Sequence, residues 1–182
     1  MKKNVVVITS SPRTGGNSDL LADAFIRGAE AAGHAVSRFN AAVDQMQPCQ
    51  ACDACWSKGE ACVFDDTFNS LAPMLLKADA IVFCSPVYWF SFSAQMKLVI
   101  DKLYVFSGNS AEKLKGSAYL LMCAGDPSPE IFSVVKKEYD AILPHLNLKP
   151  AGEVLIPGVY AKGDINTTDA LERAEQLGRE VA

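Results

Sequence analysis

The fold of this chain is decided near its start, by Val5-Val6-Val7-Ile8 followed by Thr9-Ser10-Ser11-Pro12-Arg13-Thr14-Gly15-Gly16-Asn17-Ser18. The continuous run of β-branched residues predicts a strand that is buried on both faces of a parallel sheet. From Asn17, which we expect to be an N-cap, apolar residues recur at helical spacing until Gly33. A strand, a polar loop and a helix therefore begin the chain in that order.

The same alternation continues through the rest of the sequence. It predicts strands near 35–39, at 80–84, at 117–123 and near 153–156, and helices at 67–76, near 93–104, near 129–143 and from 168 onward. Because crossovers between parallel strands are right-handed and helices must cover both faces, this order predicts a three-layer, doubly wound α/β sandwich. We expect a five-stranded parallel sheet with the strand order 2-1-3-4-5.

Ligands of such sheets bind beyond the carboxyl ends of the strands, where the strand order reverses. We therefore expect the loops at Ser10, Ser85 and Ala124 to form a site. The segment from Met46 to Asp66 is a long irregular insertion, and insertions of this length are usually functional. We expect one domain, residues 1–182, with a cysteine-rich insertion near 46–66, called the cysteine segment below.

Composition excludes several classes of protein. With 49% hydrophobic and 21% charged residues, the 182 residues are not a disordered, collagen-like or coiled-coil chain. Lysine and arginine total 17 against 21 acidic residues, and there is no basic tract, so we expect no nucleic-acid partner. No stretch approaches the roughly 18 apolar residues of a membrane span, and the N-terminus is unlike an export signal. We expect a cytoplasmic protein with reduced thiols.

The first loop gathers hydroxyl groups, the guanidinium of Arg13 and two glycines at the start of a helix. Backbone N–H groups are unpaired there and the helix dipole favours an anion, so the loop predicts a phosphate site. The alternative is an ordinary polar turn capped by Asn17. The loop matches neither G-x-x-x-x-G-K-[ST] nor G-x-G-x-x-G, and it holds no cysteine nucleophile, so a cofactor monophosphate remains as the guest.

The second loop is aromatic. We expect Pro86 to end its strand, and Tyr88, Trp89, Phe90 and Phe92 follow almost together. Such a patch can support a planar ring. It is equally typical of a subunit interface, and the two interpretations are compatible.

Four cysteines crowd into one segment, with the spacing Cys49-x2-Cys52-x2-Cys55-x6-Cys62. This spacing is close to that of ferredoxin-type iron-sulfur ligands, and it fits zinc less well. Unligated thiols that pack the insertion, a zinc site and a redox disulfide remain as alternatives. Cys84 and Cys123 end predicted core strands, and we interpret both as packing residues.

These residues resemble a known family. The loop from Ser10 to Ser18 resembles the phosphate loop of flavodoxin-fold NAD(P)H-dependent FMN reductases, and Ser85-Pro86-Val87-Tyr88-Trp89 resembles their second flavin loop. The stretch from Cys49 to Asp66, with its paired aspartates, resembles the branch that includes iron-sulfur flavoproteins. The resemblance covers nearly the whole chain.

The resemblance implies cofactor-binding residues. The FMN phosphate would contact Ser10, Ser11, Arg13, Asn17 and Ser18. The flavin ring would be bordered by Pro86, Val87, Tyr88, Trp89 and Phe90, and its other side would approach Ala124, Gly125 and Asp126. A [4Fe–4S] cluster, where one is bound, would take Cys49, Cys52, Cys55 and Cys62 as ligands.

The function that the resemblance implies is an FMN-dependent oxidoreductase. It would take hydride from NAD(P)H as substrate and pass electrons to a flavin, a quinone or another small-molecule acceptor. The flavin carries the chemistry, so no catalytic side chain is expected. Such reductases commonly pair, which implies a homodimer or homotetramer. One alternative is a flavodoxin-like or iron-sulfur flavoprotein electron carrier without direct NAD(P)H turnover, and another is a redox-sensing or metal-binding module built around the cysteine segment.

Overall fold

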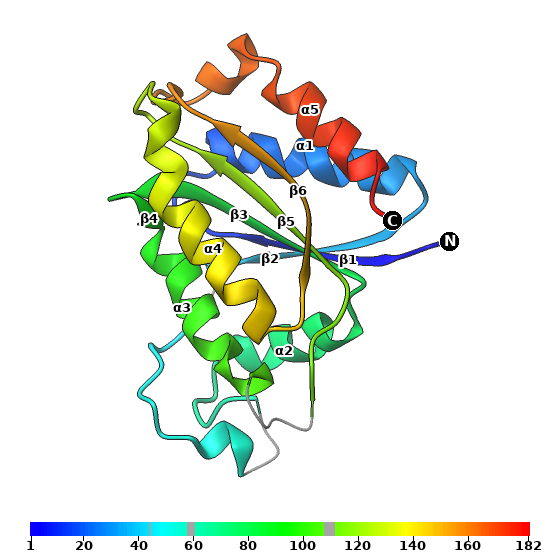
Figure 1. Ribbon diagram of the computed structural model, residues 1–182, viewed down its shortest axis with the longest axis vertical. Coiled ribbons are helices and arrows are strands. Elements are labelled where there is room, and N and C mark those ends of the chain that lie inside the picture. The colour runs from blue at the N-terminus through cyan, green and yellow to red at the C-terminus, as the bar shows by residue number, and fades with distance from the viewer. Residues whose placement is uncertain (44, 58–60, 108–111) are drawn as a thin grey trace.

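The central feature of the computed structural model, which describes residues 1–43, 45–57, 61–107 and 112–182, is a twisted sheet between two layers of helices (Figure 1). The parallel strands are β1 (Asn4–Thr9), β2 (Ala35–Asn40), β3 (Ala80–Tyr88), β5 (Ser117–Cys123) and β6 (Lys149–Ile156). Their order is β2-β1-β3-β5-β6. Numbered among the parallel strands alone, this is 2-1-3-4-5, so the predicted doubly wound sandwich is confirmed.

The end of β3 differs from the prediction. Pro86 does not end the strand, which continues to Tyr88 and turns back into the two-residue strand β4 (Ser91–Phe92). Pro86 pairs in register with Cys123 of β5, but β1 ends at Thr9 opposite Cys84. Beyond that point, in the described part of the chain, β3 has a parallel neighbour on one side only, as an edge strand does. Edge strands tolerate a proline, which has no N–H to donate. The result is a hairpin that projects past the carboxyl edge of the sheet.

In the described part of the chain, two α-helices cover one face of the sheet and three cover the other. Helices α1 (Asn17–Ala31) and α5 (Ala170–Arg179) share an apolar core with alternate residues of the strands, and α2 (Phe68–Lys77), α3 (Ala94–Lys102) and α4 (Ser133–His145) share the core of the opposite face. Among the described residues, 3₁₀ turns lie at Ala54–Trp56, Leu103–Phe106, Pro129–Phe132 and Asp164–Thr167. No helix in the described part of the chain combines the length and apolar character that crossing a membrane requires.

The backbones of α1 and α5 are in close contact. A Cβ atom on Gly28 would lie 1.9 Å from the carbonyl oxygen of Glu175, and one on Gly178 would lie 2.1 Å from that of Phe25. Glycine at both positions therefore lets the two helices pack. This contact holds the C-terminal helix, and the loop that precedes it, beside the helix that follows the phosphate loop.

Candidate functional site

A pocket of about 280 Å³ opens at the carboxyl edge of the sheet, where the end of β3 meets the loops after β1, β5 and β6. The structure brings together ten of the thirteen predicted cofactor-binding residues in its wall: Ser11, Arg13, Asn17, Ser18, Pro86, Val87, Tyr88, Ala124, Gly125 and Asp126. Four further residues that sequence analysis did not select also line it: Gly16, Cys123, Val159 and Tyr160.

Three predicted residues lie outside the wall of this pocket. The side chain of Ser10 is buried, and its hydroxyl lies 2.8 Å from Ser93 Oγ and donates to the carbonyl oxygen of Cys84. Trp89 and Phe90 form the tip of the hairpin and are 94% and 50% exposed. Ser10 thus joins two segments beneath the pocket, while the two aromatic rings point into solvent.

The N-terminus of α1 faces the pocket without a cap. The residue before the helix is Gly16, and within the described part of the chain no side chain accepts a hydrogen bond there as a cap. The first N–H groups of a helix have no partner inside the helix. These donors, the hydroxyls of Ser11 and Ser18 and the guanidinium of Arg13 therefore surround one space. The arrangement suits a phosphate, because the helix dipole and the cation both favour an anion.

The prediction that Asn17 is the N-cap was wrong. Asn17 is the first helical residue, and its amide reaches a distant loop instead. Its Nδ2 donates to the carbonyl oxygens of Val159 and Ala161, at 3.3 and 2.9 Å, and its Oδ1 accepts from the N–H groups of Gly163 and Ile165. A partner about 145 residues away along the chain could not be read from the local pattern.

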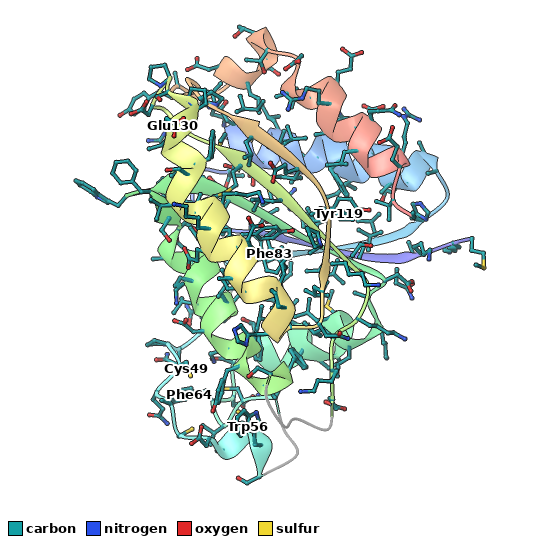
Figure 2. All side chains as sticks on the ribbon, viewed as in Figure 1. Cys49, Trp56, Phe64, Phe83, Tyr119 and Glu130 are labelled. Atoms are coloured by element: carbon teal, nitrogen blue, oxygen red, sulfur yellow. The ribbon has the colours of Figure 1, made fainter. Side chains whose placement is uncertain are left out.

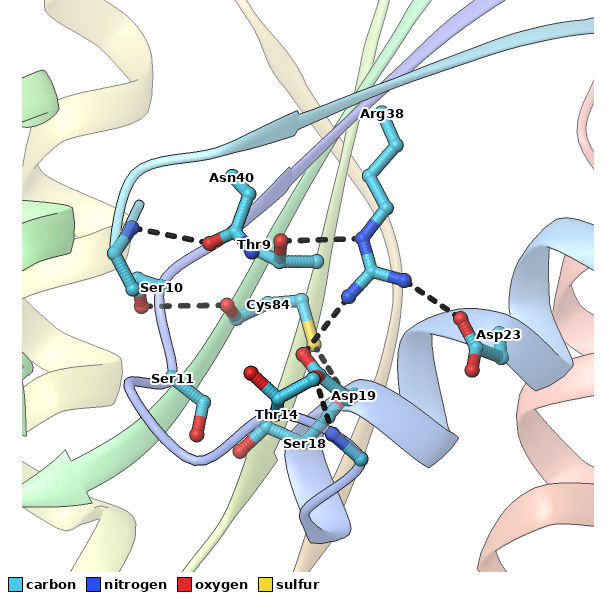
Figure 3. Close-up of polar contacts among 12 residues, drawn as sticks. Thr9, Ser10, Ser11, Thr14, Ser18, Asp19, Asp23, Arg38, Asn40 and Cys84 are labelled. Carbon is cyan, nitrogen blue, oxygen red and sulfur yellow. Dashed lines mark hydrogen bonds and ion pairs between the residues drawn. The ribbon is translucent and has the colours of Figure 1, made fainter. Parts of the chain in front are cut away.

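An ion-pair network holds the phosphate loop from behind (Figure 3). The N–H of Gly15 donates to Asp19 Oδ2 at 2.8 Å, and the other carboxylate oxygen of Asp19 accepts from Arg38 Nη2 at 2.8 Å. Arg38, on β2, also pairs with Asp23 at 2.6 Å and donates to Thr9 Oγ1. Gly15 has a φ of 64°, which glycine adopts without strain. The loop is therefore pre-shaped by contacts from β1, β2 and α1.

The loop after β6 closes one side of the pocket. The carbonyl oxygen of Tyr160 accepts from Arg13 Nη1 at 3.2 Å, and the guanidinium carbon lies 5.7 Å from the centre of the Tyr160 ring. Asp164 accepts from the N–H groups of Tyr160 and Ala161, which shapes the turn. In the sequence, the only signal for this loop was its position after the last predicted strand.

The two core cysteines are buried as predicted, and burial raises the pKa of both the Cys84 and the Cys123 thiols. Cys123 also lies beside the pocket, which the sequence did not suggest. Its sulfur lies 3.1 Å from Ser18 Oγ and contributes to the pocket wall. It is thus a neutral, weakly polar group beside the phosphate loop.

The cysteine segment lies at the other end of α3, where Figure 2 shows Cys49, Trp56 and Phe64 gathered away from the sheet residues Phe83 and Tyr119. All four cysteines line one narrow cavity of about 30 Å³, together with residues of α3 and the turn after it. Burial, reinforced by the neighbouring cysteines, raises the pKa of the Cys55 thiol. The Trp56 ring stacks on Tyr104 at 4.5 Å between centres.

The four cysteines of this segment are ligands of the kind that an iron-sulfur cluster takes. They are not arranged around a single metal-ion position. In the described ranges, no three His, Cys, Asp or Glu side chains are close enough to hold a single metal ion. A four-iron cluster takes one thiolate at each of four separate irons, which requires four thiols around a common space rather than one ion's coordination shell. The four cysteines that line one cavity supply thiols of the required number and kind.

Comparison with known proteins gives consistent relatives. Residues 3–137 match the family described as NADPH-dependent FMN reductase. The iron-sulfur flavoprotein of Archaeoglobus fulgidus is 30% identical over 177 residues, which cover 97% of this chain and 78% of that protein. The iron-sulfur flavoprotein MJ1083 of Methanocaldococcus jannaschii is 28% identical over 186 residues, covering 98% of this chain and 95% of that protein.

A solved structure supports the fold independently. The NAD(P)H:quinone oxidoreductase from Methanothermobacter marburgensis superposes with a TM-score of 0.80 at 18% identity, covering 98% of this chain and 96% of that chain. The fold is therefore flavodoxin-like. The sequence match spans the three loops that sequence analysis selected, at the edge of the sheet where the pocket lies. The chain belongs to the NADPH-dependent FMN reductase family, in the branch that includes the iron-sulfur flavoproteins.

Proposed function

We infer that this protein is an FMN-dependent oxidoreductase that accepts hydride from NAD(P)H and delivers electrons to a flavin, a quinone or another small-molecule acceptor. The observation that carries the proposal is the uncapped N-terminus of α1, which opens into a pocket that also holds Arg13 and two hydroxyl groups. That combination is suited to a terminal monophosphate. The family match supports FMN as the molecule that carries it.

Each part of the pocket has a defined task in this proposal. Arg13, Ser11 and Ser18 bind the phosphate together with the first N–H groups of α1, while Ser10 and Asn17 hold the surrounding loops. The backbone from Pro86 to Tyr88 and from Ala124 to Asp126 borders the ring. When bound, FMN supplies the hydride and electron-transfer chemistry. The chain's own groups bind the cofactor, orient it and restrict the access of water.

A second candidate function is an electron carrier that holds both FMN and a [4Fe–4S] cluster and does not turn over NAD(P)H directly. The four thiols around one cavity favour it, and so do relatives that are described as iron-sulfur flavoproteins. Cys49, Cys52, Cys55 and Cys62 would be the ligands. The two functions share the phosphate pocket and differ in where the electrons go.

The hairpin tip supports a homodimer or homotetramer. Trp89 and Phe90 are exposed, and their φ angles of 49° and 66° lie in the left-handed region that bulky residues avoid. Each such residue costs about 1–2 kcal/mol. Large aromatic side chains that are exposed at a strained turn suit a contact with a second subunit. The cytoplasmic location and the single domain remain predictions from the sequence.

One preparation tests the cofactors. Protein purified without oxygen should release FMN and no FAD, because the pocket accommodates a monophosphate and the loop has no pyrophosphate fingerprint. Mass analysis of the released flavin measures this. Counting iron and sulfide in the same sample should give about four irons per chain where the cluster is present. Zinc at one per chain, or no metal after reconstitution, would contradict the cluster.

Anaerobic stopped-flow absorption separates the two functions. A reductase should lose its oxidised flavin absorption on mixing with NADH or NADPH and regain it with a quinone. If dithionite bleaches the flavin within seconds and neither nicotinamide does so at millimolar concentration, the carrier function replaces the reductase function.

A further inference from the structure

The ammonium group of Lys102 is a buried charge that contacts one of the four cysteines. Its side chain is 2% exposed, at the last turn of α3. Nζ lies 2.5 Å from Asp66 Oδ2 and 3.3 Å from the sulfur of Cys62. The rings of Phe64 and Phe68 are centred 5.3 and 5.6 Å from Nζ. The cation is thus enclosed by a carboxylate, a thiol and two aromatic faces.

This arrangement gives Cys62 surroundings that differ from those of the other three cysteines. Its N–H donates to Asn69 Oδ1 at 2.8 Å, and Asn69 Nδ2 donates back to the carbonyl oxygen of Cys62 and to that of Phe64. The backbone around Cys62 is therefore tied to α2, while its sulfur faces the Lys102 ammonium. Cys49 and Cys52, by contrast, are exposed.

The carboxylate of Asp66 is itself held in place beside the Lys102 ammonium. Its side chain is 6% exposed, and its oxygens also accept from the N–H groups of Gln47 and Phe68. These contacts hold the carboxylate against the ammonium, and Nζ is the member of the pair that contacts the sulfur, at 3.3 Å.

We propose that Lys102 is a positioning residue that sets the reduction potential of the cluster at the four cysteines, by donating a hydrogen bond to the Cys62 sulfur and placing a positive charge beside it. This inference rests on the proposed presence of the cluster. Reduction adds one electron, forms and breaks no bond, and leaves all four thiolates bound. The electron comes from reduced FMN in the protein, or from dithionite in a titration. A cation and an N–H donor at a ligand sulfur stabilise the more negative, reduced form.

The sign of the effect distinguishes this role from simple packing. Removing the cation should lower the midpoint potential of the cluster, whereas removing the opposing carboxylate should raise it. A purely structural ion pair would give loss of cluster in both cases and no opposite shifts. Because the two charges act at different distances from the sulfur, removing both should leave the potential below that of the wild type, with a smaller shift than removal of the cation alone.

The experiment is an anaerobic redox titration of the reconstituted protein, followed by visible absorption and electron paramagnetic resonance. Lys102→Met should lower the one-electron equilibrium constant about tenfold, which is about 59 mV, and Asp66→Asn should shift it in the other direction. Lys102→Met leaves Asp66 buried without its partner, so the double variant Lys102→Met/Asp66→Asn provides a second test in a chain without that unpaired charge. Lys136→Met is the matched control, since it removes an ammonium on α4 that pairs with Asp140 of the same helix and with Glu153 of β6.

The possible results distinguish the role of Lys102 from the presence of the cluster. Opposite shifts for Lys102→Met and Asp66→Asn, with an unchanged potential for Lys136→Met, support the role of Lys102. If the wild type binds the cluster and every variant molecule that keeps a cluster has the wild-type midpoint potential, the role of Lys102 is overturned, even where the iron content falls. Wild-type protein that binds no iron after reconstitution overturns the cluster itself, and the inference with it.

Discussion

The phosphate-loop pocket and the cysteine segment are built in different ways. The pocket is made by the ends of parallel strands, and its loop is held by polar contacts from β1, β2, α1 and the loop after β6. In its described residues, the cysteine segment contains one 3₁₀ turn and two non-glycine residues at positive φ, Ala51 and Asp53. The buried ammonium of Lys102 contacts it through Asp66 and Cys62. One site is thus part of the sheet architecture, whereas the other is attached to it.

Helix α3 connects the two regions. Its N-cap Ser93 accepts from the N–H of Met96 and lies 2.8 Å from Ser10 Oγ at the phosphate loop, while its last residue, Lys102, contacts Cys62. Nine residues at about 1.5 Å each make the helix roughly 13 Å long. The carboxyl edge of the sheet thus forms one site from its own strand ends and loops. The cysteine segment, which has little regular structure, is instead held in place by its contacts with α3.

The largest effect should come from Lys102→Met. Removing one partner of a buried ion pair leaves Asp66 uncompensated, which typically costs about 3–5 kcal/mol in the free energy of unfolding. Because the phosphate loop makes no contact with this pair, FMN affinity at temperatures where the variant is folded should not change. Urea unfolding followed by circular dichroism and a flavin fluorescence titration measure the two quantities. A large loss of FMN affinity would break the distinction between the regions.

Arg13→Ala should weaken FMN binding and leave the stability of the fold unchanged. A lost charge-assisted contact with the phosphate should cost about 1.5–3 kcal/mol of FMN binding free energy. The iron content and the unfolding free energy should be unchanged, because Arg13 is exposed and lies outside the cysteine segment. Fluorescence titration of the flavin-free protein with FMN is the measurement, and Arg173→Ala on α5 is a control for loss of an exposed guanidinium. Unaltered affinity would remove Arg13 from the phosphate site.

Asn17→Ala tests whether the amide binds the phosphate or holds the neighbouring loop. It removes four hydrogen bonds to the backbone between Val159 and Ile165, so we expect the free energy of unfolding to fall by about 1–3 kcal/mol. FMN affinity should fall less than in Arg13→Ala, because the effect on the cofactor is indirect. Thermal unfolding and the same titration check this. A large affinity loss without destabilisation would restore the direct role.

The smallest effect should come from the hairpin tip. Replacing Trp89 by Asn and Phe90 by Gly introduces the residues that a turn with two positive φ angles prefers, so the free energy of unfolding of the isolated subunit should rise by about 1 kcal/mol. The same change removes the exposed aromatic rings, and the oligomer should become weaker. Size-exclusion chromatography over a range of concentrations measures the assembly. A variant that assembles like the wild type would exclude this hairpin from the interface.

Sequence patterns were sufficient for the sheet and for most of the pocket. The β-branched runs are strands because they are buried on both faces, and their order along the chain allows few right-handed topologies. Since all parallel strands point the same way, their carboxyl ends must meet, so ten of the thirteen predicted cofactor-binding residues line one pocket. The cysteine spacing similarly indicated a shared site without structural information, and all four cysteines line one cavity.

Tertiary structure alone decided what depends on residues far apart in the chain. Ser10 is buried because Ser93 lies beside it, Asn17 bonds to a loop after β6, and Tyr160 enters the pocket because α5 is packed against α1. The contact of Lys102 with Cys62 belongs to the same class. Local sequence determines which backbone conformations and buried faces are favourable. It does not determine which side chains meet across 40 to 150 residues, because those contacts exist only after the elements have packed.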